Sequence, residues 1–222
     1  MLLNFSYSYL LRLFLLFSSI FSSSLLANSA ASGKALYQQC AVCHGSAGEG
    51  NEQLNAPALA GQFDWYISRQ LNNFSIALRG AHKDDIHGKQ MASIAKGLTS
   101  ESDVLLLSQF IKSFPKPVVN TKSRAQIDAN SLKNGSRYYH AKCGACHGGE
   151  GQGNKAFNAP KLNMLDTGYL LRQMNNFSTG IRGTEKADKL GRQMAMMAKT
   201  TSGQELKDIV YYLSTMKNSD VK

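Results

Sequence analysis

The sequence predicts an all-α fold made of two tandem domains. When the sequence is aligned with itself at an offset of 103 positions, residues 40–114 superpose on residues 143–217 without a gap, and 28 of the 75 pairs are identical. A repeat of this length is far longer than a solenoid unit. Neither copy contains a run in which apolar and polar residues alternate as they do in a β-strand. We therefore expect two copies of one small domain, each with a few helices joined by long loops.

Two prolines, Pro115 and Pro117, mark the boundary between the copies, because they stop a helix and favour an extended chain. We place the N-terminal domain at residues 31–118 and the C-terminal domain at residues 119–222. Residues 119–134 have no counterpart ahead of the first copy, so we expect them to form a strap between the domains.

Residues 1–30 have the features of a secretory signal peptide. Leu10 to Phe21 is almost wholly apolar, Arg12 is the only charge near the start, and small residues follow. About a dozen apolar residues fall short of the roughly 20 that span a bilayer. We expect cleavage between Ala27 and Ala31 and a mature protein in the periplasm. An uncleaved membrane anchor is the alternative.

Three helices can be placed in each copy. The first runs into the cysteine motif described below, and the second covers residues 65–74 or 169–177. The last begins at Ser100 or Ser202, where the sequence has a capping-box pattern. Because these serines are 102 positions apart, the second copy should lack one residue just ahead of its last helix.

The four cysteines form two Cys-x-x-Cys pairs, and a histidine directly follows each pair. The motifs are Cys40, Cys43 and His44 in the first copy, and Cys143, Cys146 and His147 in the second. This is the attachment pattern of c-type heme, in which the histidine ligates the iron. Disulfides, a zinc site and a thioredoxin-like motif are the alternatives. A closed zinc site needs four ligands, and a thioredoxin-like motif needs a βαβ setting. The sequence therefore predicts two covalently bound heme c groups, each containing iron, and these would add apolar burial to two small domains.

The sixth iron ligand is predicted from the spacing of the methionines. Met91 is the only methionine of the first mature copy and lies 47 residues after His44, and Met194 lies 47 residues after His147. The other five methionines of the second copy align with no methionine in the first and suit a packing role. His82 and His87 offer bis-histidine ligation as the alternative for the first heme.

On these residues the chain resembles the cytochrome c4 family of di-heme cytochromes over its whole mature length. The resemblance implies two tandem class I cytochrome c domains, each wrapped around one covalent heme. It also implies that the carbonyl groups of Pro57 and Pro160 accept a hydrogen bond from the ring N–H groups of His44 and His147, which orients each ring.

Two further pairs of matched residues suggest contacts with the heme propionates. Arg79 and Arg182 lie in matching Arg-Gly pairs, and a guanidinium beside a buried heme suits a carboxylate. Tyr66 and Tyr169 also match, and their hydroxyl groups would reach propionates or their rings would pack at the heme edge. Solvated arginines are the alternative reading of the first pair.

His/Met ligation fills both axial positions of each iron, so we expect an electron carrier and not an enzyme. The resemblance implies single-electron transfer between redox proteins, from a membrane quinol-oxidising complex of the respiratory chain to a terminal oxidase or reductase. The alternatives are the cytochrome subunit of a dehydrogenase, such as flavin-containing sulfide dehydrogenase, and a di-heme peroxidase. No nucleic-acid partner is expected.

Charge is distributed unequally between the two copies. Residues 28–118 contain 8 Lys and Arg against 7 Asp and Glu, whereas residues 119–222 contain 16 against 8. A basic surface steers encounters with an acidic partner or with an anionic membrane. We therefore expect the C-terminal domain, with Lys186, Lys189 and Arg192 ahead of Met194, to face acidic docking surfaces of respiratory complexes and to permit peripheral membrane association.

Overall fold

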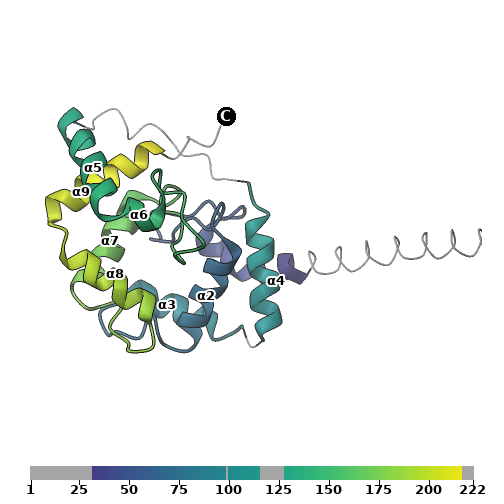
Figure 1. Ribbon diagram of the computed structural model, residues 1–222. Helices are drawn as coiled ribbons and strands as arrows, with labels where there is room; N and C mark the ends of the chain where they lie inside the picture. Colours follow the sequence, from purple (N-terminus) through teal and green to yellow (C-terminus); the bar gives the residue numbers. More distant parts are fainter. Residues whose placement is uncertain (1–31, 99, 116–127, 217–222) are drawn as a thin grey trace, which may run out of the picture.

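The computed structural model describes residues 32–98, 100–115 and 128–216 (Figure 1). The expected signal peptide and most of the expected strap lie outside these residues. Among the described residues, no helix combines the length and the apolarity needed to cross a membrane.

Each domain has a helix that leads into its cysteine motif and further helices that follow it. In the N-terminal domain residues 32–44 are helical, and α2 (Asp64–Ser75), α3 (Ile86–Ala95) and α4 (Glu101–Lys112) follow. The C-terminal domain contains α5 (Ala129–Lys142), α6 (Gly144–His147), α7 (Thr167–Ser178), α8 (Lys189–Lys199) and α9 (Gly203–Thr215). The described residues contain only two isolated β-bridges and no strand, so the all-α prediction is confirmed.

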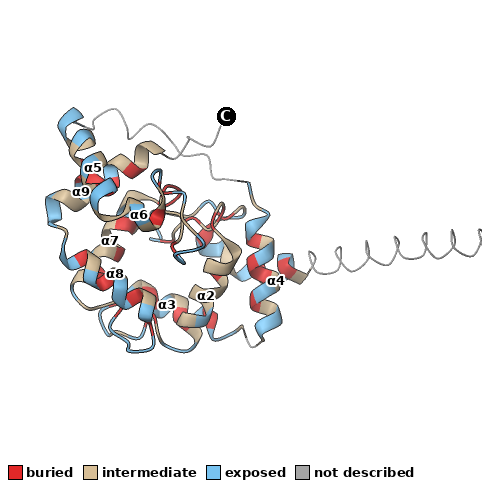
Figure 2. Ribbon diagram, in the orientation of Figure 1, coloured by how far each residue is buried: buried red, intermediate tan, exposed pale blue. Residues whose placement is uncertain are grey.

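The first and last helices of each domain cross at a glycine. A Cβ atom on Gly135 of α5 would collide with the backbone of Asp208 in α9. A Cβ atom on Gly33 would lie 2.7 Å from the carbonyl oxygen of Leu106 in α4. Buried residues line one side of α4 and α9, and the other side is exposed (Figure 2). These close crossings bring the helix that carries the cysteine motif against the core.

One buried tyrosine on the first helix of each domain connects this core to the loop after the motif. Tyr37 lies among Leu107 and Ile111, and Tyr139 occupies the same place in the C-terminal core. Their hydroxyl groups donate to the carbonyl oxygens of Gly45 at 2.7 Å and Gly148 at 2.5 Å. Each hydroxyl therefore fixes the residue that directly follows the motif histidine.

The spacing of the two copies changes twice along the chain. Tyr37 and Tyr139 are 102 positions apart, whereas the cysteine motifs are 103 apart. The extra residue of the C-terminal domain is absorbed at Cys143, where α5 ends and α6 begins. The offset returns to 102 at Ser100 and Ser202, which cap α4 and α9 as predicted. The full capping box forms only at Ser202, because the residue at the third helical position is a glutamate there and the shorter Asp103 in α4.

Two expectations about secondary structure were wrong or incomplete. Residues 129–134 are not part of a strap, because they form the first turns of α5. The Asp128 side chain caps the N-terminus of this helix by accepting a hydrogen bond from the Ser131 N–H. The sequence also gave no signal for α3 and α8, which carry Met91 and Met194. Both helices begin after a buried aspartate that accepts a hydrogen bond from a glycine N–H, and a glycine in the first turn weakens the helical pattern.

Candidate heme sites

The two motif histidines have the same geometry. His44 and His147 each lie at the end of a helix, where Gly45 and Gly148 take positive φ angles of 84° and 83°. Each imidazole is buried, with 5% of the residue exposed. Burial lowers the pKa of both rings, although the hydrogen bond to a backbone carbonyl opposes this shift. The neutral imidazole is therefore favoured, and that is the form that ligates iron.

A proline carbonyl orients each ring. Nδ1 of His44 lies 2.8 Å from the carbonyl oxygen of Pro57, and Nδ1 of His147 lies 2.9 Å from that of Pro160. Because a carbonyl only accepts, Nδ1 carries the proton in both rings. Nε2 is then the nitrogen left with a free lone pair for a metal. The implied role of the two prolines is confirmed.

The four cysteines form no disulfide with one another. Burial raises the pKa of the Cys40 and Cys143 thiols to about 11 in each case. Among the described residues, no three His, Cys, Asp or Glu side chains gather as a metal site requires, so the zinc alternative receives no support. Paired thiols beside a buried, oriented histidine match the donor set for a covalent heme.

The predicted methionine ligands lie in equivalent surroundings. Met91 of α3 packs against the cluster of Phe74 and Ala95, and Met194 of α8 packs against the cluster that contains Phe177. By contrast, Met164 belongs to the C-terminal core. The matched surroundings agree with a shared role for Met91 and Met194, and their assignment as ligands stays a prediction.

The histidines of the alternative ligand set lie in different settings. His82 is partly exposed, with Nδ1 3.8 Å from the Asp84 carboxylate. His87 has a buried Nδ1 without a hydrogen-bond partner in the structure.

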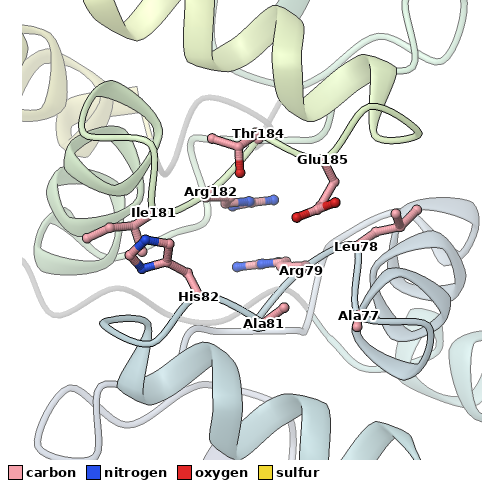
Figure 3. A pocket seen from close by; sticks show the side chains of 11 residues that line it. Ala77, Leu78, Arg79, Ala81, His82, Ile181, Arg182, Thr184 and Glu185 are labelled. Carbon is pink, nitrogen blue, oxygen red and sulfur yellow. The ribbon is translucent and has the colours of Figure 1, made fainter.

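The matched arginines meet at the boundary between the domains. Figure 3 shows the guanidinium groups of Arg79 and Arg182 lying one above the other, roughly parallel. Both side chains line a pocket of about 120 Å³. Each also lies 4.4 Å from the ring centre of a phenylalanine in its own domain, Phe74 or Phe177. Among the described residues, no carboxylate forms an ion pair with either arginine.

Two glutamines and a tyrosine hold this pair across the domain boundary. Arg79 donates to Gln70 at 2.8 Å, to Tyr169 at 2.9 Å and to Gln173 at 3.0 Å. Arg182 donates to Gln173 at 2.6 Å and to Gln70 at 3.0 Å. Each glutamine oxygen therefore accepts from the arginine of its own domain and from that of the other domain.

The Nε atoms of both arginines are buried and lack a partner, which supplies a test of the cofactor prediction. Two adjacent cations, of which Arg79 is buried and Arg182 half-buried, need an anion, and two unused buried N–H groups need an acceptor. The propionate groups of two hemes would supply both the negative charge and the hydrogen-bond acceptors. The structure thus agrees with the propionate hypothesis for Arg79 and Arg182 and disagrees with solvated side chains. For Tyr169 it shows an unexpected partner, because the hydroxyl binds Arg79 of the other domain.

The sequence did not reveal that these matched residues join the two domains. The arginine cluster consists of Gln70, Arg79, Tyr169, Gln173 and Arg182. Its contacts span up to 112 positions, and one sequence does not state directly which surfaces meet. A usable signal was the identity of Gln70, Arg79 and their counterparts, since a contact between two equivalent surfaces needs the same residues on both sides.

The chain contains two helical domains, and each presents a pair of cysteines beside an oriented histidine. This arrangement defines a protein with two covalent hemes. The sequence pattern of the cytochrome c family matches residues 30–115 and again residues 132–217, so the chain belongs to the cytochrome c family. It is a di-heme class I c-type cytochrome with two heme c groups, bound at Cys40 and Cys43 and at Cys143 and Cys146.

Several characterised proteins are similar over most of their length. Cytochrome c-552 of Acidithiobacillus ferridurans is 28% identical over 92% of this chain and 88% of the relative. Cytochrome c4 of Azotobacter vinelandii is 27% identical over 76% and 81%. The thiosulfate dehydrogenase electron acceptor of Stutzerimonas stutzeri is 26% identical over 84% and 87%. The solved structure of Acidithiobacillus ferrooxidans cytochrome c4 gives a TM-score of 0.62 at 26% identity, covering 79% of this chain and 98% of that one.

Proposed function

We propose that this chain is a periplasmic electron carrier that moves single electrons from a quinol-oxidising respiratory complex to a terminal oxidase or reductase. His44 and Met91 ligate the N-terminal iron, and His147 and Met194 ligate the C-terminal iron. The bound hemes supply one-electron redox chemistry. The chain itself contributes the four ligands, the orientation of both histidines and the cation pair beside the propionates.

The observation that carries this proposal is the equivalence of the two sites. Each domain has a buried histidine bonded to a proline carbonyl, and each has a methionine at the same spacing on an equivalent helix. A di-heme peroxidase must free one axial position for its substrate, so one of its sites differs from the other. Two equivalent, saturated sites favour electron transfer.

Carbon monoxide separates a carrier from an enzyme, because it binds ferrous heme only where an axial position is open. The reduced protein should show no carbon monoxide spectrum at neutral pH, and stopped-flow mixing with a quinol-oxidising complex should reduce both hemes. Carbon monoxide binding at one heme per chain would support the peroxidase instead.

A second candidate is the electron-accepting partner of a dehydrogenase. The similarity to the thiosulfate dehydrogenase electron acceptor of S. stutzeri favours it specifically. Purification of the native protein distinguishes the two functions. A stable second chain that reduces this one in the presence of its own substrate would support the dehydrogenase partner, whereas a free protein reduced by the quinol-oxidising complex supports the shuttle.

A further inference from the structure

Gln62 of the N-terminal domain is hydrogen-bonded to Lys161 of the C-terminal domain, the residue that follows Pro160. The Gln62 side chain is buried, with 5% of the residue exposed. Its Oε1 accepts from the N–H of Lys161 at 3.1 Å and from that of Phe63 at 3.1 Å, and its Nε2 donates to the carbonyl oxygen of Lys161 at 3.0 Å. Because one end must accept from N–H groups and the other must donate to a carbonyl, these partners fix the orientation of the amide.

The Lys161 N–H, which donates to Gln62, belongs to the same peptide group as the carbonyl that orients His147. The carbonyl of that group is the Pro160 carbonyl, 2.9 Å from Nδ1 of His147. A continuous chain of hydrogen bonds therefore runs from the imidazole through the Pro160–Lys161 peptide group to Gln62. Hydrogen bonds in such a chain polarise one another, so the bond to Gln62 makes the Pro160 carbonyl a stronger acceptor.

In the part of the chain that the structure describes, the N-terminal domain has no equivalent hydrogen bond beyond the peptide group that orients His44. The counterpart of Gln62 is Leu165, and the counterpart of Lys161 is Ala58. Leu165 and Ala58 belong to one apolar cluster, and the Ala58 N–H finds no acceptor among the described residues. The two motif histidines thus have the same immediate partner, and they differ in what that partner is bonded to.

We propose that Gln62 is a positioning residue that lowers the reduction potential of the C-terminal heme. A stronger acceptor at Nδ1 draws the ring proton toward Pro160 and makes the imidazole of His147 a more basic ligand. A more basic ligand stabilises ferric iron over ferrous iron. The inference depends on the ligation of iron by His147 in the proposed function, and it makes one domain tune the cofactor of the other.

The test replaces Gln62 with leucine, the residue found at the matching position, in the full two-heme protein. Redox titration followed by NMR of the heme methyl groups reports the potential of each heme separately. We expect the potential of the C-terminal heme to rise and that of the N-terminal heme to stay unchanged, together with faster hydrogen exchange at the Lys161 amide. Because Gln62 lies in the N-terminal domain and contacts the C-terminal domain, a general disturbance would move both potentials.

Two further variants make the result decisive. Arg172→Lys removes a two-pronged contact between the domains, to the side-chain and backbone oxygens of Asn55 at 2.8 Å each, and keeps the charge. It should leave the C-terminal potential unchanged. If the leucine variant fails to bind two hemes per chain, Gln62→Met replaces it in the same titration.

The proposal is overturned if the C-terminal potential does not change on loss of the Gln62 amide, or if Arg172→Lys raises it equally. These outcomes do not depend on the partner of the protein. A shifted potential in a protein that exchanges no electrons with respiratory complexes would refute the shuttle and leave the role of Gln62 in place.

Discussion

At the scale of single residues, each motif histidine is held by a proline carbonyl of its own domain, whereas Arg79 is held by side chains of both domains. The cysteine motifs were predictable, because attachment of a heme demands a fixed spacing along one stretch of chain, and the proline partners were implied by the family resemblance. The partners of Arg79 and Tyr169 were not predictable, since they lie about 90 positions apart. The sequence suggested a propionate or solvent for Arg79, and a propionate or packing at the heme edge for Tyr169. The structure shows in addition that the two side chains are hydrogen-bonded to each other.

The ligand assignment can be tested at Met91. Met91→Ala should abolish the weak far-red absorption band that Met-ligated ferric heme gives in the N-terminal domain and should lower that heme's potential, because the thioether ligand raises it. Absorption spectroscopy and redox titration measure both effects, and Met196→Ala, an exposed methionine of α8, is the control. If band and potential persisted in the Met91 variant, His82 or His87 would become the better candidate ligand.

At the scale of elements, the helices that carry amphipathic or capping patterns were predicted and the two methionine-bearing helices were not. The starts of α4 and α9 were identified from Ser100 and Ser202, which the structure confirms as caps. Both α3 and α8 are short helices with a glycine in the first turn, so packing against the domain and a buried aspartate cap stabilise them more than intrinsic propensity does.

The crossing of α5 and α9 predicts a strong effect of a single methyl group. Gly135→Ala should destabilise the C-terminal domain by about 1–3 kcal/mol, because the new Cβ would overlap the backbone of Asp208. Thermal unfolding of the holoprotein measures the loss. Gly203→Ala, on α9 with nothing within 4 Å of the added atom, should leave stability unchanged or slightly higher. Equal losses in both variants would mean that the helices do not cross closely at Gly135.

The junction of α5 and α9 also predicts a dependence on pH. Lys142 and the backbone N–H of Ser202 hold the pKa of Glu205 below its usual value. The folded protein therefore binds this proton less readily than the unfolded chain, and the resulting stability is present above about pH 4.5 and is lost as pH falls through the lowered pKa. Glu205→Gln should lower the unfolding temperature at neutral pH and should approach the parent protein in acid.

Asp103 of α4 provides the matched control for Glu205. It occupies the same helical position, but its side chain does not complete a capping box. Asp103→Asn should therefore change the pH profile less than Glu205→Gln does. Identical profiles for the two variants would remove the reason for assigning the effect to Lys142 and Ser202.

At the scale of the whole molecule, the two domains share one fold and differ in charge. Lys186 and Lys189 are exposed and form no ion pair among the described residues, whereas Lys83 of the N-terminal domain lies 3.8 Å from the Asp84 carboxylate. The structure therefore leaves more uncompensated positive charge beside α8 than beside α3. Composition alone predicted the excess, but not which basic side chains lie beside a carboxylate.

This difference predicts unequal roles in docking. Charge reversal at Lys186 and Lys189 should slow association with an acidic redox partner and flatten its dependence on salt, because exposed charges act over a Debye length of roughly 8–10 Å. Reversal at Lys83 and Lys89 should do less. Stopped-flow electron transfer across an ionic-strength series measures the two effects, and equal slopes for both pairs would count against a polarised docking face.

The arginine cluster makes the contact between the domains isologous, because Arg79 with Gln173 and Arg182 with Gln70 are the same pairing in two directions. Such a surface is self-complementary, so a single-domain ancestor could have formed it as a symmetric homodimer. Two identical chains must change together at every position, whereas two copies joined in one chain can diverge. The differences between Gln62 and Leu165 and between Lys161 and Ala58 require two copies that change independently, and a tandem chain allows this while it keeps the two copies paired.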